Sequence, residues 1–254
     1  MAERPAPLVL VVQASPAEGL GTYAAVAATG QALLAAEMSL RLEALGAAVV
    51  PLAPVVPFAP DGPPAGQAFH WGRWYTTGAR AALDAAATDG RRVEALGYTG
   101  AGALALVDDD YLHALISPIP GEVVANNRYS ADAFAVAGDL DAALAGLERC
   151  RTDNAAVRCL EAAGFTWRDP GAGAGGGAGG GAGLWSRFDV DTPLDLALLR
   201  LACRLPGVRP LDPSVLGFLE TATLPGGRRL EVRGLAGLGE VLRSRDAQLV
   251  VAGR

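Results

Sequence analysis

Short apolar runs alternate along this chain with longer segments rich in Ala and Leu, and this alternation sets the fold class. Runs over residues 8–13 and 47–52 predict buried strands. Between them the sequence predicts a Gly/Ala-rich loop over 15–30 and a helix over 31–46 that ends at Gly46. Strand, helix and strand in this order are typical of a βαβ unit. We therefore expect an α/β protein with a mostly parallel sheet and helices on both of its faces.

The alternation continues to about residue 205. Further strands are predicted over residues 103–107, 122–125, 133–137 and 184–190. Further helices are predicted over residues 79–87, 140–150, 154–163 and 194–203. An aromatic-rich segment, 70–78, precedes the first of these helices, and Asp153 is the expected N-cap of the third.

Prolines interrupt the pattern after residue 205, and we place a domain boundary there. The chain then consists of a domain of residues 1–205 and a small C-terminal α+β appendage of residues 206–254. The appendage is predicted to contain a helix over 213–221 and a hairpin at Gly226-Gly227. It either packs on the first domain or is an incomplete part of a longer protein.

Residues 171–183 consist of nine Gly and four Ala. The tract contains a formal G-x-G-x-x-G pattern, but a dinucleotide-binding loop needs a strand before it and a helix after it. Neither is predicted at this place. We interpret the tract as a flexible surface loop of the first domain.

The 254 residues carry a net charge of −6, and all 21 basic residues are Arg. An acidic chain without Lys is a poor match for nucleic acid, so no nucleic-acid partner is expected. No signal peptide and no membrane span are predicted, which favours a cytoplasmic, reduced protein. Cys150 and Cys159 are therefore interpreted as buried thiols, and a zinc site is not expected. The sequence does not indicate an oligomeric state.

Two acids stand one residue apart at the end of the predicted strand 184–190. Asp189 and Asp191 would point to the same face of that strand. Thr192 then serves as a helix N-cap, with Asp195 completing a capping box and Pro193 at the first helical position. The acids either belong to this cap or bind Mg²⁺ where an open α/β sheet binds its ligands.

The same segment, F-D-V-D-T-P-L-D-L over residues 188–196, resembles the closing motif of the MobA-like nucleotidyltransferases, a family of the GT-A type. The resemblance in element order covers residues 7–203. It implies a parallel-rich sheet, Mg²⁺ held by Asp191 and Asp189, and transfer of a nucleotidyl group from a nucleoside triphosphate to a small phosphorylated or polar acceptor, with release of pyrophosphate.

The chain departs from that family at two places. The first loop, residues 13–22, contains neither Arg nor Lys, and Gly102 or a neighbour stands where the family has a metal-binding Asp. Backbone amides of the first loop could still hold phosphate oxygens. The candidate phosphate-binding residues there are Ser15, Gly19, Gly21 and Thr22.

Small residues at Thr99, Gly100 and Gly102 would let a nucleotide or a sugar approach the backbone closely, or they form a tight strand-to-turn transition. A polar stretch over residues 125–132 follows another predicted strand. It either binds a polar acceptor or phosphate or forms an Asx-rich turn. Its candidate binding residues are Asn126, Asn127, Arg128 and Ser130, with Arg128 as the candidate cation for the triphosphate and a catalytic role.

Other polar clusters have simpler interpretations. Three aspartates over residues 108–110 precede a helix, so capping is favoured over metal binding. His70 and the aromatic residues after it either pack in the core or form a platform for a nucleobase. Two functions therefore remain: a Mg²⁺-dependent nucleotidyltransferase, which the motif favours, and a non-catalytic nucleotide- or metabolite-binding module, which the two departures favour.

Overall fold

A computed structural model describes residues 6–14, 22–53, 69–172, 185–206 and 208–231 of the chain. Its strands are β1 (Leu8–Val12), β2 (Ala48–Leu52), β3 (Ala95–Thr99), β4 (Glu122–Ala125), β5 (Ala133–Ala137), β6 (Thr166–Arg168), β7 (Thr223–Leu224) and β8 (Arg228–Arg229). Its α-helices are α1 (Thr22–Ala44), α2 (Trp71–Thr88), α3 (Asp109–Leu115), α4 (Leu140–Glu148), α5 (Ala156–Ala162), α7 (Pro193–Ala202) and α8 (Pro213–Thr221). Two short 3₁₀ helices are η1 (Asp153–Ala155) and η2 (Pro170–Ala172).

Six strands form one mixed sheet in the order β2-β1-β3-β5-β4-β6. β1 pairs in parallel with β2 and with β3, and β4 pairs in parallel with β6. β5 is antiparallel to both of its neighbours, β3 and β4. β1, β2, β3 and β4 therefore end at one edge of the sheet, and β5 begins there. The expectation of an α/β protein with a mostly parallel sheet is confirmed.

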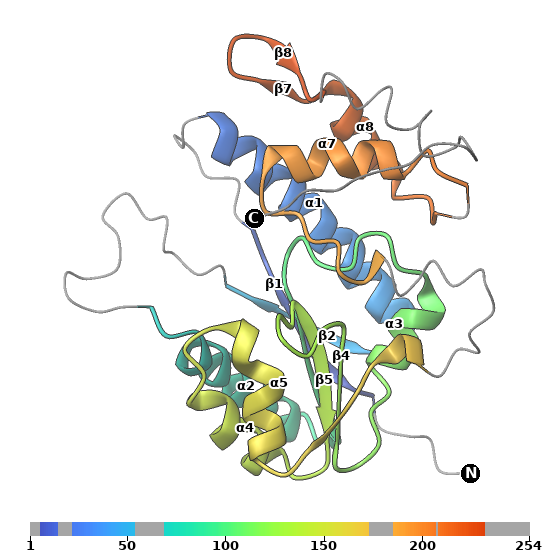
Figure 1. Ribbon diagram of the computed structural model, residues 1–254. Helices are drawn as coiled ribbons and strands as arrows, with labels where there is room; N and C mark the ends of the chain where they lie inside the picture. Colours follow the sequence, from blue (N-terminus) through green and yellow to red (C-terminus); the bar gives the residue numbers. More distant parts are fainter. Residues whose placement is uncertain (1–5, 15–21, 54–68, 173–184, 207, 232–254) are drawn as a thin grey trace.

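Helices cover both faces of the sheet (Figure 1). Leu8 and Leu10 of β1 pack in one cluster with side chains of α2, α4 and α5. Val9 and Val11 point the other way and pack in a second cluster with side chains of α1 and α3. Successive residues of a strand alternate between faces, so a strand that is apolar throughout needs cover on both sides.

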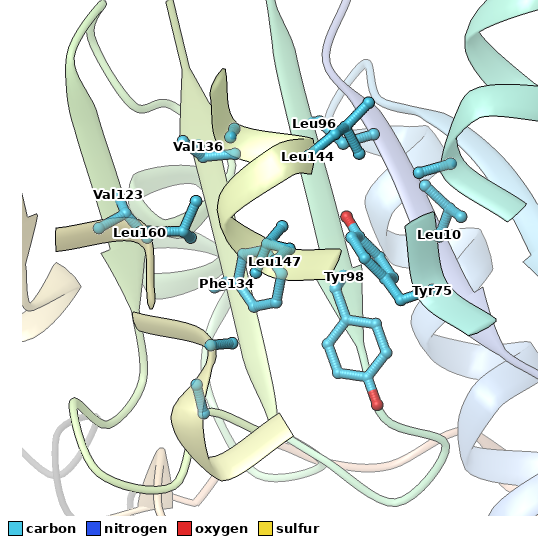
Figure 2. Packing of buried hydrophobic residues seen from close by; sticks show 14 of the residues in the cluster. Leu10, Tyr75, Leu96, Tyr98, Val123, Phe134, Val136, Leu144, Leu147 and Leu160 are labelled. Carbon is cyan, nitrogen blue, oxygen red and sulfur yellow. The ribbon is translucent and has the colours of Figure 1, made fainter. Parts of the chain in front are cut away.

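Aromatic rings fill the centre of the first cluster (Figure 2). Trp71 and Tyr75 stack with ring centroids 5.1 Å apart, and both meet Tyr98 edge-on. Phe134 of β5 completes the group. The segment 70–78 was expected to precede a helix, and that expectation is wrong, since α2 begins at Trp71 with His70 as its N-cap. Core packing, the first of the two interpretations, holds for Trp71 and Tyr75, which are almost fully buried.

The predicted loop over 15–30 is wrong in its second half, because α1 begins at Thr22. Gly30, a residue that favours loops, lies inside this helix for a packing reason. A Cβ at Gly30 would approach the Leu196 side chain of α7 to 2.5 Å. The glycine therefore permits close contact between two helices. The predicted end of the helix at Gly46 is confirmed by that residue's φ of 86°.

Two predicted strands are wrong. Residues 101–106 form consecutive turns, with Leu104 at a φ of 61°, and the central strand lies earlier in the chain, at β3. Apolar side chains in these turns are buried as thoroughly as in a strand, so composition alone could not separate the two. Residues 185–190 also contain no strand, and the Phe188 amide donates to the Trp185 carbonyl in a turn.

The cap expected at Asp153 is wrong as well. Asp153 lies within η1, and α5 begins after Ala155 without a side-chain cap. The capping role of Asp108 is confirmed, because its carboxylate accepts the Tyr111 amide at 2.8 Å at the start of α3.

The described part of residues 206–231 packs against the main sheet domain through α1 and α7. Leu34 of α1, Leu196 of α7 and Val215 of α8 belong to one buried cluster. Arg209 forms an ion pair with Glu37 of α1. The predicted helix over 213–221 is confirmed as α8, and so is the hairpin, whose two turn glycines have φ values of 80° and 72°.

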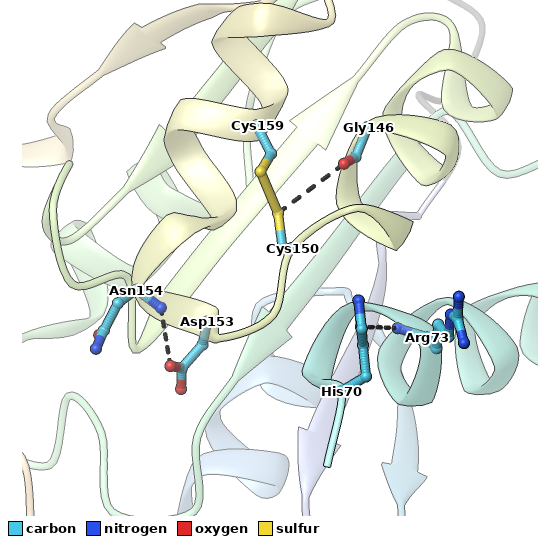
Figure 3. Close-up of a disulfide and its surroundings, with 7 residues drawn as sticks. All are labelled: His70, Arg73, Gly146, Cys150, Asp153, Asn154 and Cys159. Carbon is cyan, nitrogen blue, oxygen red and sulfur yellow. Dashed lines mark hydrogen bonds between the residues drawn. A yellow bond between two sulfur atoms is a disulfide. The ribbon is translucent and has the colours of Figure 1, made fainter. Parts of the chain in front are cut away.

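Cys150 and Cys159 are joined by a disulfide, with their Cα atoms 6.6 Å apart (Figure 3). The expectation of two separate thiols is therefore wrong. The bond connects the end of α4 to α5 and closes a loop that carries Asp153. The expected cytoplasmic location stays a prediction.

No described helix is both long and apolar enough to cross a membrane. The glycine tract from residue 173 onward lies outside the described residues, and so do residues 54–68. So does the last part of the appendage, residues 232–254.

Candidate functional site

Four aspartates gather beyond the edge of the sheet where β3 ends. They are Asp132, Asp153, Asp189 and Asp191, and they come from three separate segments of the chain. The negative charges of Asp132, Asp191 and Asp153 all act on Asp189. The sheet topology explains why Asp132 joins this group. Asp132 precedes β5, and β5 runs antiparallel to its neighbours. Asp132 therefore lies at the same edge of the sheet as the carboxyl ends of the parallel strands.

Asp132 is held against the end of β3 by its backbone. The Gly100 amide donates a 2.8 Å hydrogen bond to the Asp132 carbonyl. The Asp132 carboxylate accepts a longer hydrogen bond, 3.4 Å, from Asn126 Nδ2. Burial, opposed by that hydrogen bond and aided by the charges of Asp153 and Asp191, raises the pKa of Asp132 to about 6.

Asp189 is the most perturbed acid of the group. Its carboxylate accepts a 2.8 Å hydrogen bond from the Val190 amide. Burial first, and then the charges of Asp132 and Asp191, raise the pKa of Asp189 to about 7. A carboxyl group with this pKa changes its charge near neutral pH.

Asp191 lies at the exposed end of the same segment, directly before α7. Burial, then the charges of Asp195 and Asp153, raise its pKa. The predicted capping box of α7 is confirmed, with Thr192 as N-cap and Asp195 at the third helical position. The cap uses the backbone amide of Asp191, which donates to Asp195 at 3.2 Å. Capping therefore accounts for Thr192 and Asp195 and leaves the role of the Asp189 carboxylate to be explained.

The residues of the polar stretch 125–132 are mostly engaged with the protein itself. Asn126 is buried and binds the Ser186 carbonyl and the Ala133 amide. Asn127 accepts the Tyr129 amide, as an Asx turn does. Of these three contacts, the one made by Asn127 agrees with the turn interpretation of the stretch.

Two other residues of that stretch reach the α4–α5 region. Ser130 donates a 2.7 Å hydrogen bond to Asn154 Oδ1. Arg128 donates a 3.0 Å hydrogen bond to Glu161 of α5. The pKa of the Arg128 guanidinium is raised by this bond and by the charge of Glu161. Arg128, our candidate for the triphosphate, is thus already paired with a carboxylate.

The remaining candidates that the structure describes lie at and just after the end of β3 and at the start of α1. Thr99 is buried at the end of β3 and its hydroxyl donates to the Gly100 carbonyl. Gly102 is buried against Val190. Thr22 is the first residue of α1. Ser15, Gly19 and Gly21 lie outside the described residues.

Sequence reasoning missed Asp153 and Tyr98 as neighbours of the site and did not single out Asp132. Tyr98 is buried close enough to the aspartates to be affected by their charges. Its hydroxyl oxygen accepts a 3.4 Å hydrogen bond from Trp71 Nε1. Burial, then the charges of Asp153, Asp132 and Asp189, raise the pKa of Tyr98. The position of Asp132 directly before an apolar run was the one available signal, since a polar residue at a strand end faces the sheet edge.

Magnesium is compatible with this group of side chains. Among the described residues no three His, Cys, Asp or Glu side chains are arranged to hold a metal ion by themselves. Mg²⁺ is commonly bound by only one or two carboxylates, with phosphate and water oxygens completing the shell. Asp189 and Asp191 could serve as those carboxylates, and a bound cation would offset the burial and the charge repulsion that raise their pKa values.

His70 has a structural explanation. Its ring nitrogen Nδ1 accepts the Arg73 amide at 3.4 Å and caps α2 (Figure 3). The nearby Asp153 carboxylate accepts the Asn154 amide at 2.8 Å. Burial raises the pKa of Asp153.

The fold and the site define an α/β protein with a mixed six-stranded sheet and an acidic group at the edge where β3 ends. No known protein-family model matches the chain, and no curated protein matches it.

Proposed function

We propose that this protein binds a magnesium nucleoside triphosphate at the edge where β1 and β3 end, and that it transfers a nucleotidyl group to a small phosphorylated or polar acceptor. The observation that carries the proposal is the convergence of Asp132, Asp189 and Asp191, from separate segments, at that edge. Carboxylates crowded and partly buried in this way are costly unless a cation or protons compensate them. The resemblance of residues 188–196 to the MobA-like motif supports the same assignment.

Each part of the site has a chemical task in this proposal. Asp189 and Asp191 hold Mg²⁺, which when bound neutralises phosphate charge and favours departure of pyrophosphate. Residues 15–21 lead into the N-terminus of α1, where backbone amides and the helix dipole favour phosphate. An acceptor oxygen attacks the α-phosphorus, and the bond from that phosphorus to the bridging oxygen of the β-phosphate breaks.

A non-catalytic nucleotide- or metabolite-binding module is the second candidate function. The pairing of Arg128 with Glu161 favours it, because a guanidinium already bound to a carboxylate contributes less to the transition state of phosphate transfer. The chain also contains no Lys that could take its place. The nucleotidyltransferase requires a nucleoside triphosphate to bind and pyrophosphate to be released, whereas the non-catalytic module binds a nucleotide or another metabolite and releases no pyrophosphate.

Thermal unfolding with each of the four nucleoside triphosphates, with and without Mg²⁺, tests the proposal. A ligand that binds only the folded state raises the unfolding midpoint. We expect a rise that needs both the nucleotide and Mg²⁺, and that is lost in Asp191→Asn. Asp84→Asn, an exposed acid of α2, is the matched control and should behave as the wild type. No midpoint shift with any nucleotide would overturn the proposal, and pyrophosphate release in the same mixtures separates the two functions.

A further inference from the structure

The backbone at Val190 lies between the two proposed metal-binding acids, and Gly102 packs directly against it. A Cβ added to Gly102 would lie 2.4 Å from the Val190 carbonyl oxygen and 3.0 Å from Asp189 Oδ1. A contact of 2.4 Å is too short for any real side chain, and the atom it meets belongs to the backbone. The segment 189–191 can therefore occupy its place only because residue 102 has no side chain.

The neighbouring glycine in the same turn provides a comparison. A Cβ at Gly100 would meet the Asp132 carbonyl at 3.5 Å and the Ala103 Cβ at 3.8 Å, which are ordinary van der Waals distances. Neither glycine has a positive φ. The need for glycine at residue 102 thus comes from the close approach of Val190 and not from the backbone conformation of the turn.

Gln31 of α1 holds the same carbonyl from another direction. Its Nε2 donates a 2.7 Å hydrogen bond to the Val190 carbonyl. The Val190 side chain is fully buried in the cluster it shares with Leu34 and Leu196. Its amide donates to the Asp189 carboxylate. These contacts hold the carbonyl, the side chain and the amide of Val190 in place. They therefore also fix the positions of Asp189 and Asp191 on either side of it.

We propose that Gln31 and Gly102 are positioning residues that hold Asp189 and Asp191 in the geometry that binds the metal of the nucleotide. This inference rests on the proposed function and deepens it. Gln31 lies on α1, so its hydrogen bond also ties this helix to the segment that carries the two acids. The sequence analysis predicted that a ligand could approach the backbone at Gly102. The Val190 backbone occupies that space instead.

Mn²⁺ binding in the presence of inorganic tripolyphosphate tests the inference without a choice of nucleobase. Gly102→Ala should raise the Mn²⁺ dissociation constant by about tenfold or more, as loss of outer-shell support does at other metal sites. Gln31→Met keeps the length of the side chain but donates no hydrogen bond, and it should weaken binding in the same direction. Gly217→Ala, at an exposed position of α8 with open space around its Cβ and no part in the site, is the matched control and should bind Mn²⁺ as the wild type does.

Amide NMR signals supply a readout that does not depend on the metal. Gly102→Ala and Gln31→Met should both shift the signals of Asp189, Val190 and Asp191, whereas Gly217→Ala should leave them in place. If Gly102→Ala fails to fold, Gln31→Met still decides the question. Wild-type affinity in folded Gly102→Ala or Gln31→Met would overturn the positioning roles. If the wild type binds no Mn²⁺, the proposed function is overturned instead. In that case the amide signals still test the positioning roles, because unshifted signals in both variants would show that neither Gln31 nor Gly102 holds residues 189–191.

Discussion

Arg128 Nε donates a 3.0 Å hydrogen bond to Oε2 of Glu161, and the pair joins the loop before β5 to the surface of α5. Both side chains are partly exposed, so the pair contributes little to folding stability. The pair matters for the proposed function, because Glu161 neutralises the cation that the sequence analysis predicted for a triphosphate.

Replacing Glu161 by Gln should release the charge of Arg128 for a phosphate ligand. We expect Glu161→Gln to bind the magnesium nucleotide more tightly, by about twofold to tenfold, with little change in thermal stability. Glu148→Gln, which breaks the exposed ion pair with Arg80, is the control and should change neither property. Calorimetric titration measures the affinity. Unchanged affinity in Glu161→Gln would show that Arg128 does not reach the ligand.

The raised pKa values of Asp132 and Asp189 predict how stability depends on pH. These pKa values are about 6 and about 7 in the folded protein, against 3.8 for an Asp side chain free of such surroundings. Between about pH 4 and pH 7 the folded state therefore holds protons that the unfolded chain has released. The free energy of unfolding should fall as the pH rises through this window, and it should level off above about pH 7.

Asp189→Asn removes the larger of these two effects. At about pH 8 without divalent cations, the variant should be more stable than the wild type, by roughly 2–4 kcal/mol. Its stability should also depend less on pH between about 5 and 8. Urea unfolding at several pH values measures both quantities. A wild type whose stability rises or stays level across that range would contradict the assigned burial of these acids.

Two helical glycines should respond to Ala in opposite directions. A Cβ at Gly72 of α2 would lie 2.1 Å from the Leu147 carbonyl oxygen, so Gly72→Ala must push α2 and α4 apart and should cost about 1–3 kcal/mol. Gly217 of α8 is exposed and has open space around its Cβ position. Gly217→Ala should stabilise the protein by about 0.5–1 kcal/mol, because Ala is the better helix former. Denaturant unfolding compares them, and equal effects would contradict the described helix packing.

Local patterns predicted four of the six strands of the main sheet and the start of α7. The apolar runs at β1, β2, β4 and β5 and the capping box of α7 follow from residue types within a few positions of one another. The central strand was misplaced to 103–107 because turn residues and strand residues there are equally apolar and equally buried. Residues 95–99 form the strand because they pair with β1 and β5. This pairing joins residues far apart in the sequence, so a short stretch of sequence cannot reveal it.

The site was predictable only where its residues are neighbours in sequence. Asp189 and Asp191 stand in a motif with a recognisable cap, and sequence reasoning found them. Asp132 and Asp153 join them through the antiparallel placement of β5 and the loop between α4 and α5. Contacts of this kind depend on sheet order, so the sequence alone could not assemble the group.

Paramagnetic broadening by Mn²⁺ with a nucleoside triphosphate is the most direct test of the central claim, that the metal of the nucleotide binds at Asp189 and Asp191. Metal binding at these two acids predicts that amide NMR signals of Val190, Asp191 and Thr192 broaden first, that Gly100 follows, and that signals of the β7–β8 hairpin stay sharp. It also predicts that Asp191→Asn abolishes the effect. Broadening centred elsewhere in the chain, or broadening that persists unchanged in Asp191→Asn, would contradict it.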